Sequence, residues 1–359
     1  MLKAFGLVSP EFNLADFLVG FYIEQAAGVY DPRSKTMLIA NWVVPEMQQM
    51  VLAHELTHAL QDQSFDLEKF LRAVRDDDDA GNARQAVVEG YATAAMIQKA
   101  IEPAALSELP SLSPVMEQVV RMQTQEFPAF SSAPFFFRFQ ALFPYMQGMS
   151  FIQRGLTSGG WEKLNQVFSR PPDTTKEIFQ PDVYFKKESL PRIVLKEASP
   201  LSRTPSLRLV DENAMGELGY YALLGQFISE ADARSVSQGW AADRYVVYEN
   251  AVAKQYALVA LTRWSSPETS LAFFRDYHSI LARKYAELSP NSRSTQDLFI
   301  GSTAAGSVIL LREKDECLWA EGVPQPEVDS MLTYLRSQSA RLAKMARFDR
   351  VANPINRGY

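Results

Sequence analysis

Residues 53–63 have the sequence AHELTHALQDQ, and two of the three histidines of the chain, His54 and His58, stand four positions apart in it. The segment from residue 46 to residue 62 contains neither glycine nor proline, which predicts a helix. Because one helical turn separates positions i and i+4, both imidazoles lie on one face of that helix. Two imidazoles so placed can bind one metal ion, and Glu55 lies beside them. The stretch therefore predicts a metal site carried by a helix.

The pattern HExxH at residues 54–58 is specific in a chain with so little histidine. With three histidines among 359 residues, chance alone would produce such a match in about one chain in a thousand. In zinc hydrolases with this pattern the histidines bind the metal and the glutamate takes a proton from water. We therefore expect one Zn²⁺ per chain, bound by His54 and His58, with Glu55 as the general base. A catalytic zinc ion has three protein ligands, so a third ligand must come from elsewhere in the chain.

Three other residues compete for the place of third ligand. His278, the remaining histidine, lies on a predicted helix of the second half of the chain, where a packed or exposed role is favoured. Asp62 projects past an ion held between the histidines, because a helix rises about 6 Å in four residues, and we expect it to hydrogen-bond a ligand instead. Glu89 is the stronger candidate, because small residues within residues 84–96 would let its helix approach the first one closely. The alternative is an amphipathic helix on which Glu89 is solvated.

The sequence on either side of the motif shows a hairpin and further helices. A turn signal at residues 30–34 between two short apolar runs predicts a β-hairpin within residues 25–42. The four aspartates at residues 76–79 predict a solvated loop. After this loop, Asn82 can cap a helix that continues to residue 101.

The pattern changes between residues 191 and 205, where prolines and serines indicate a connection between domains. Before this segment the chain is mainly helical, with one small hairpin. After it, strands separated by short turns alternate with helices. This predicts an α+β protein with a metal-binding domain at residues 1–195. An α+β accessory domain with a mainly antiparallel sheet follows at residues 205–359.

Composition excludes several classes of protein. Apolar residues make up 47% of the chain and no uncharged apolar stretch is long enough to cross a membrane, so we expect a globular protein without a transmembrane segment. Lys and Arg number 36 against 42 for Asp and Glu, with no basic block, which argues against a nucleic-acid partner. Cys317 is the only cysteine, so neither an internal disulfide nor a thiolate zinc site is expected. The first residues contain no clean apolar run and predict no leader.

Several stretches resemble a little-characterised bacterial family of zincin metallopeptidase-like proteins. These are residues 53–63, 88–90, 171–175, 28–32 and 239–245. The chain also resembles the gluzincins, whose third zinc ligand is a glutamate on a later helix. That resemblance implies Glu89 as the third ligand and a zincin-like fold for residues 1–195.

The chain departs from the family pattern in three respects. Tyr91 stands where members often have an aspartate, so a second carboxylate next to the site is not implied. Members tend to begin earlier, with a leader and an additional N-terminal segment, which leaves the compartment open and permits an extracytoplasmic location. The Gly-x-Met-x-Asn segment of gluzincin aminopeptidases is missing. An endopeptidase or oligopeptidase is therefore expected rather than an exopeptidase.

The expected reaction is hydrolysis of peptide bonds in a peptide or unfolded protein. An extended substrate would pair with the strand that contains Met37, Leu38, Ile39 and Ala40. Tyr145 and Tyr91 are candidates for the donor that stabilises the oxyanion. The accessory domain would shape or gate the cleft. The oligomeric state stays open. Two alternatives are a non-catalytic binding or assembly protein that retains the fold and a hydrolase of non-peptide amides.

Overall fold

The computed structural model describes the chain in three stretches, residues 1–123, 127–195 and 199–352. The chain forms two compact units, residues 11–188 and residues 1–10 together with those from residue 189 onward. The sequence-based boundaries, 1–195 and 205–359, differ from these chiefly at the N-terminus. There the short helix α1 (Leu2–Phe5) belongs to the second unit, because the Phe5 ring packs edge-on against Tyr245 with centroids 5.3 Å apart. The sequence gives no sign of this contact, because Phe5 and Tyr245 lie far apart in the chain.

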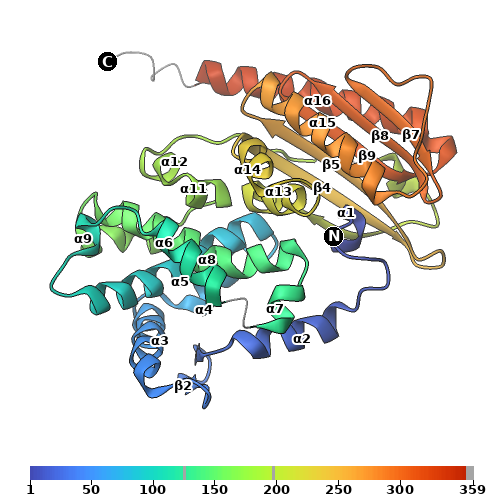
Figure 1. Ribbon diagram of the computed structural model, residues 1–359. Helices are drawn as coiled ribbons and strands as arrows, with labels where there is room; N and C mark the ends of the chain where they lie inside the picture. Colours follow the sequence, from blue (N-terminus) through green and yellow to red (C-terminus); the bar gives the residue numbers. More distant parts are fainter. Residues whose placement is uncertain (124–126, 196–198, 353–359) are drawn as a thin grey trace. The chain divides into compact units, whose positions relative to one another are not determined.

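The unit of residues 11–188 is mainly helical (Figure 1). Its elements in chain order are α2 (Leu14–Gln25), β1 (Gly28–Asp31), β2 (Thr36–Ile39), α3 (Pro45–Phe65), α4 (Leu67–Arg72), α5 (Asp78–Ile101), η1 (Leu106–Glu108), α6 (Ser113–Gln123), α7 (Pro128–Ser132), α8 (Phe135–Leu156), α9 (Gly160–Leu164), α10 (Gln166–Ser169), α11 (Thr175–Phe179) and α12 (Pro181–Phe185). The predicted hairpin is confirmed, because β1 pairs antiparallel with β2 and places Gly28 opposite Ile39.

The acidic run at residues 76–79 is only in part the predicted solvated loop. Asp76 is exposed in a turn, but Asp78 and Asp79 already belong to α5. Asp77 is the N-cap of α5 and accepts a hydrogen bond from the backbone N–H of Ala80. Asp79 is buried, and its carboxylate accepts hydrogen bonds from the backbone N–H and the hydroxyl of Thr175. Aspartate suits both places because it can satisfy free N–H groups at a helix start. The helix therefore begins at Asp78, before the predicted cap at Asn82.

Gly90 of α5 brings this helix close to α8, a contact that the sequence analysis did not predict. The expected approach of α5 to α3 is also present, because the amide of Gln61 reaches the backbone carbonyl of Val88 at 3.2 Å. A Cβ atom added at Gly90 would lie 2.1 Å from the carbonyl carbon of Gly148. A Cβ atom added at Gly148 would lie 2.1 Å from the carbonyl oxygen of Ala86. Neighbouring positions on a helix point about 100° apart, so Gly90 faces α8 while Glu89 faces α3. The close packing positions α8 against the helix that carries Glu89.

The second unit contains a seven-stranded antiparallel sheet with the order β3-β4-β5-β9-β8-β7-β6. Its elements in chain order, after α1, are η3 (Pro200–Arg203), β3 (Arg208–Asn213), α13 (Gly216–Gly225), α14 (Glu230–Ser237), β4 (Trp240–Asn250), β5 (Gln255–Trp264), α15 (Pro267–Lys284), β6 (Ser289–Pro290), β7 (Leu298–Thr303), β8 (Gly306–Glu313), β9 (Glu316–Val323), η4 (Gln325–Glu327) and α16 (Val328–Ala352). The predicted α+β class with a mainly antiparallel sheet is confirmed.

Helices cover both faces of this sheet, as the alternation along β9 shows. Leu318 and Ala320 join an apolar core with Met331 and Leu335 of α16. Trp319, which points to the opposite face, packs in an aromatic cluster with residues of α13 and α15. Both faces of the central strands are therefore buried. Among the described residues, no helix combines the length and the apolar character needed to span a membrane.

Candidate metal site

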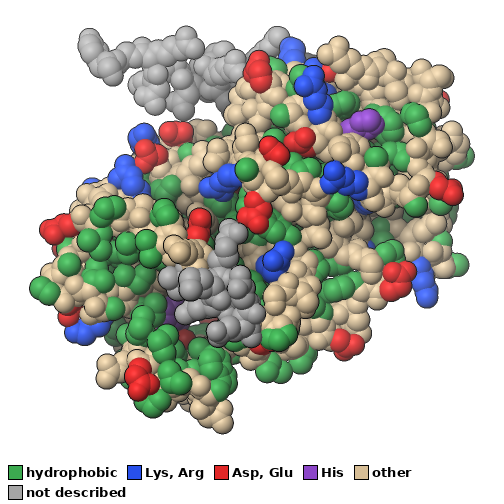
Figure 2. Space-filling model, in the orientation of Figure 1, with side chains coloured by type: hydrophobic (Ala, Val, Ile, Leu, Met, Phe, Trp, Pro, Cys, Tyr) green, Lys and Arg blue, Asp and Glu red, His purple; other side chains and the backbone are tan. Residues whose placement is uncertain are grey.

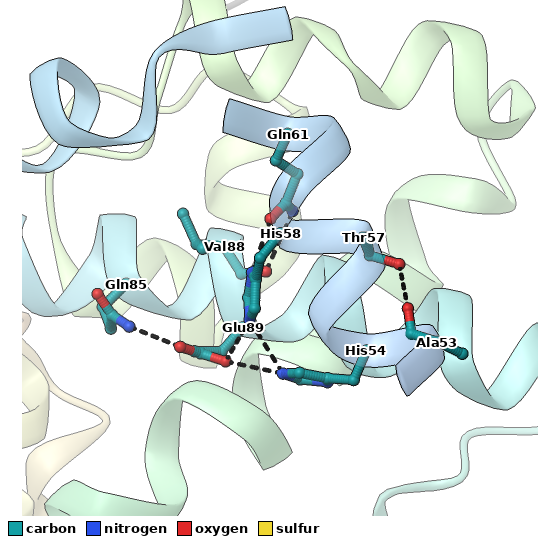
Figure 3. A network of polar contacts seen from close by, with 8 residues as sticks. All are labelled: Ala53, His54, Thr57, His58, Gln61, Gln85, Val88 and Glu89. Carbon is teal, nitrogen blue, oxygen red and sulfur yellow. Dashed lines mark hydrogen bonds and ion pairs between the residues drawn. The ribbon is translucent and has the colours of Figure 1, made fainter. Parts of the chain in front are cut away.

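Two imidazoles and one carboxylate converge between α3 and α5 (Figure 3). The Nε2 atoms of His54 and His58 lie 3.0 Å apart. Each of them lies 3.2 Å from Oε2 of Glu89. All three side chains are largely buried, with exposed fractions between 10% and 13%. The structure thus brings together the three residues that the sequence analysis singled out as ligands.

The triangle of these three atoms is suited to a small cation. Ligand atoms at about 2.0–2.1 Å from a tetrahedral ion stand about 3.3–3.4 Å apart. The observed separations of 3.0–3.2 Å are close to that value. Two neutral imidazole nitrogens and a carboxylate oxygen are all lone-pair donors, so a cation among them would neutralise their mutual repulsion. His54, His58 and Glu89 could therefore hold one metal ion.

Gln61 determines which nitrogen of His58 faces this centre. Its side-chain amide donates to the backbone carbonyl of Val88 at 3.2 Å, so Oε1 must be the atom that faces His58. Oε1 lies 2.9 Å from Nδ1 of His58 and accepts a hydrogen bond from its N–H group. In the neutral imidazole, Nε2 then carries the lone pair and points to Glu89 and His54. Such a partner on the far nitrogen is the usual way in which a ligating histidine is oriented.

Gln85 orients the carboxylate of Glu89, as Gln61 orients the imidazole of His58. Its amide donates to Oε1 of Glu89 at 2.8 Å, which leaves Oε2 for the centre. Burial alone would raise the pKa of Glu89, but hydrogen bonds from His54 and His58 and their charges lower it to about 2. For His58, burial opposes the charged form, yet the hydrogen bond and charge of Glu89 raise the pKa overall. The carboxylate is thus ionised at any pH near neutrality.

Glu55 lies close enough to this centre for its charge to act on His58, and its carboxylate makes no hydrogen bond in the described part of the chain. The residue is 6% exposed. Within residues 1–123, 127–195 and 199–352 its carboxylate accepts no hydrogen bond. A Cβ atom added at Gly28 would lie 3.0 Å from Oε1 of Glu55, so the backbone of β1 closes one side. A carboxylate that makes no hydrogen bond keeps its lone pairs available, which is what a proton acceptor requires.

Tyr145 of α8 lies on another side of the centre. Its ring centroid is 6.1 Å from that of His54. Although 41% of the residue is exposed, partial desolvation of its phenol, together with the charges of Glu89 and Glu55, raises the pKa of the phenol. Its hydroxyl makes no hydrogen bond to any described residue. The phenol is therefore a protonated, uncommitted donor next to the histidines.

Tyr91, the other tyrosine considered from the sequence, is already engaged. Its hydroxyl donates to the side-chain oxygen of Asn165 at 2.9 Å. Its ring packs on Trp161 with centroids 5.0 Å apart. Tyr145 is therefore the better placed of the two, since its hydroxyl is free and its ring lies near His54.

Asp62 does not have the role expected from the sequence. Its carboxylate accepts hydrogen bonds from the hydroxyl of Tyr30, from Lys35 and from the backbone N–H of Leu67. It thus joins the hairpin to the end of α3. The residue that bonds a histidine is its neighbour Gln61. The reason is angular, because Asp62 is turned about 100° from Gln61 towards the hairpin.

The residues predicted to bind substrate lie in and just after β2. Met37 is half-buried, Leu38 and Ile39 are exposed, and Ala40 follows the strand. The strand whose backbone lies against Glu55 is β1, through Gly28. His278 lies in α15 of the second unit, where its ring packs against Phe299 with centroids 4.4 Å apart. It belongs to a different unit from His54 and His58 and is far from them in the sequence.

Gln61 and Gln85 are the residues of this site that the sequence analysis missed. Gln61 follows His58 by three positions, and Gln85 precedes Glu89 by four. Both spacings place a side chain on the same helix face as the ligand that it supports. A search for amide or carboxyl groups at these spacings would have found them.

Comparison with known proteins adds little to this geometry. A family model described as a domain of unknown function (DUF8575) matches residues 205–332, roughly a third of the chain. No curated protein and no solved structure matches the chain. The matched residues lie in the second unit and include neither Glu89 nor the motif of α3. The functional argument therefore depends on the site itself.

Proposed function

We propose that the protein is a zinc-dependent peptidase of gluzincin type, acting as an endopeptidase or oligopeptidase. One observation carries the proposal. Three lone-pair donors, His54, His58 and Glu89, meet within 3.2 Å, and next to them lies Glu55, whose carboxylate makes no hydrogen bond among the described residues. A ligand set of two histidines and a glutamate with a free general base is the donor set of thermolysin-like zinc hydrolases.

Zinc bound by these residues would lower the pKa of water and polarise a carbonyl group. The chain itself supplies the other parts of the reaction. Glu55 takes the proton of the attacking water and gives it to the leaving amine. Tyr145 donates its hydroxyl hydrogen to the oxygen on which negative charge develops, because its raised pKa keeps it protonated. An extended peptide would pair with the outer edge of the hairpin strand that contains Met37, Leu38 and Ile39.

The placement of the two amides that support the ligands, Gln61 and Gln85, also fits a metal-binding site. Gln61 and Gln85 each hold one ligand by the atom that does not face the centre. The ligands are thereby oriented before any substrate arrives, so little reorganisation is needed when charge develops.

Substitution of the base tests the proposal most directly. Glu55→Gln keeps the size of the side chain and removes its ability to accept a proton. We expect zinc content to stay at one ion per chain while hydrolysis of a peptide pool falls by about a hundredfold or more. Glu46→Gln, at an exposed glutamate in the first turn of the same helix, is the matched control and should leave activity unchanged.

The outcomes separate the competing functions. Full activity in Glu55→Gln would show that another group acts as the base. Wild-type protein that holds zinc but cleaves no peptide in the pool would overturn the peptidase proposal and favour a binding or assembly protein. Wild-type protein without zinc after purification in the absence of chelators, and after zinc addition, would overturn the metal assignment.

A further inference from the structure

The side of α3 that faces away from the metal site carries a row of exposed leucines. Leu52, Leu56 and Leu60 are 40%, 48% and 62% exposed. They follow one another at a spacing of four residues, so they form one ridge along the helix. At about 100° per residue, Leu56 points about 200° away from His54. The row is therefore separate from the ligand face.

No charge interrupts this row. Between Glu46 and Asp66, the charged residues of α3 are Glu55 and Asp62, and both are buried on other sides of the helix. Figure 2 shows hydrophobic side chains gathered over α3 and the adjoining hairpin. A helix face in water normally carries Lys and Glu, and an uncharged apolar patch marks an interaction surface. The surface consists of Gln49, Leu52, Ala53, Leu56, Ala59, Leu60 and Gln63, called the leucine row below.

The leucine row has a symmetry of its own. Positions equally far from Leu56 carry the same residue type: Leu52 and Leu60, Ala53 and Ala59, Gln49 and Gln63. A second α3 laid antiparallel across Leu56 would therefore meet leucine with leucine, alanine with alanine and glutamine with glutamine. A two-fold interface must be self-complementary in this way. A different partner would not require the row to match its own reverse.

We propose that the protein forms a homodimer in which α3 of one copy pairs antiparallel with α3 of a second copy about a two-fold axis at Leu56. The electrostatics agree with this pairing. Antiparallel helices place the positive N-terminal end of each dipole beside the negative C-terminal end of the other. Alanines on both sides of Leu56 permit a close approach of the helices.

The size of the surface sets the strength of the dimer. The leucine row contributes seven residues from each copy, whereas a standard interface uses about 20–30 residues a side. We therefore expect a reversible dimer with a dissociation constant of about micromolar or above. Because the row faces away from the histidines, dimer formation leaves the metal site uncovered.

Mass measurement on the full chain tests the proposal. Sedimentation equilibrium over about 5 to 500 µM should show the mean mass rising from 40.4 kDa towards twice that value. Leu56→Glu places two carboxylates at the axis and should weaken the dimer at least tenfold. Val252→Glu alters a side chain in the second unit that is 97% exposed, and should leave the dimer intact. Unchanged zinc content and thermal unfolding show that each variant is folded.

A charge exchange tests the antiparallel register. Leu52→Lys and Leu60→Glu should each weaken the dimer when introduced alone. Combined in one chain they should restore it, because each lysine then faces a glutamate of the other copy. The two positions are eight residues apart on one helix, too far to pair within a copy. Failure of the combination to restore the dimer would overturn the antiparallel arrangement.

A cysteine at the axis gives a second, independent readout. Leu56→Cys should form a covalent dimer under mild oxidation, while Val252→Cys should not, and Cys317 is buried and unreactive. A wild-type chain that stays at 40.4 kDa up to the highest concentration would overturn the proposal. So would a dimer that Leu56→Glu does not affect. Binding of the leucine row to neutral lipid vesicles without any dimer would identify a membrane surface as the occupant instead.

Discussion

Two buried clusters of ionisable side chains, one in each unit, differ in their balance of hydrogen-bond donors. In the second unit, Glu321 is 1% exposed and is surrounded by donors. The hydroxyl of Tyr277 donates to one of its oxygens at 2.6 Å. The other oxygen accepts from Lys284 at 2.7 Å and from the hydroxyl of Tyr285 at 2.8 Å. Every acceptor there is satisfied by the chain itself.

The cluster of His54, His58 and Glu89 has the opposite balance, with acceptors that no donor among the described residues satisfies. Its three facing atoms are all acceptors when the imidazoles are neutral. Gln61 and Gln85 bind only atoms that face away from the centre: Oε1 of Gln61 accepts a hydrogen bond from Nδ1 of His58, and the amide of Gln85 donates to Oε1 of Glu89. Burial without donors is costly, so natural structures rarely retain it without a ligand or a function. The comparison teaches that the donor balance of a buried polar cluster, rather than its burial, separates a structural cluster from a metal site.

Removal of one ligand should have the largest effect. His58→Ala takes away one of three ligand atoms, and we expect the bound zinc to fall from one ion per chain to near zero, with loss of hydrolysis. His278→Ala, at the histidine of the second unit, is the control and should keep both. Elemental analysis of protein purified without chelators measures the difference. Equal zinc in the two variants would refute the ligand set.

Removal of the cation from the Glu321 cluster should affect stability instead of metal binding. Lys284→Met leaves a buried carboxylate without its charge partner, and we expect the free energy of unfolding to fall by about 3–5 kcal/mol. Zinc content should not change. Urea unfolding followed by tryptophan fluorescence provides the measurement. Lys99→Met, which breaks an exposed pair with Glu102, should cost far less, because water screens that pair. Similar losses in both variants would show that the Glu321 cluster contributes no more to stability than an exposed ion pair.

Substitution of the supporting amide should have an intermediate effect. Gln61→Leu removes the acceptor that orients His58, and we expect zinc affinity to fall by about 10- to 100-fold. Asp62→Asn disturbs the hydrogen bonds to Tyr30 and Lys35 and should change zinc affinity by less than about threefold. Competition with a chromophoric chelator measures both. The reverse order would restore the sequence-based view that Asp62 supports a ligand.

A pH series should give the smallest effect, of opposite sign in the two forms of the protein. The raised pKa of His58 means that the metal-free folded state binds a proton more tightly than the unfolded chain does. Its stabilising contribution is complete below the unfolded pKa, about 6.5, and is lost as the pH rises through the folded value. The zinc-loaded form gains stability over the same rise, because protons stop competing with the metal. Thermal unfolding at about pH 6 and about pH 8, with and without zinc, distinguishes the two slopes.

Much of this site follows from local sequence. His54 and His58 must share a helix face, because a segment without glycine or proline forms a helix and four residues make about one turn. Glu89 was singled out from the small residues around it, one of which, Gly90, in the structure serves the contact with α8. The α+β class and the hairpin were likewise readable from apolar spacing and turn residues. The binding of zinc and the peptidase activity stay predictions.

The sequence by itself determined the elements whose cause is local: the helix of the HExxH motif, the β1–β2 hairpin and the antiparallel sheet of the second half. Only the tertiary structure decided how distant segments meet. It placed Glu89 across from two histidines, directed Asp62 to the hairpin and Gln61 to His58, and assigned α1 to the second unit. The physical reason is that hydrogen bonding and periodicity within a helix or strand act over a few residues. The partner of a side chain, by contrast, depends on the packing of helices far apart in the chain, and a change of one position turns a side chain by about 100°.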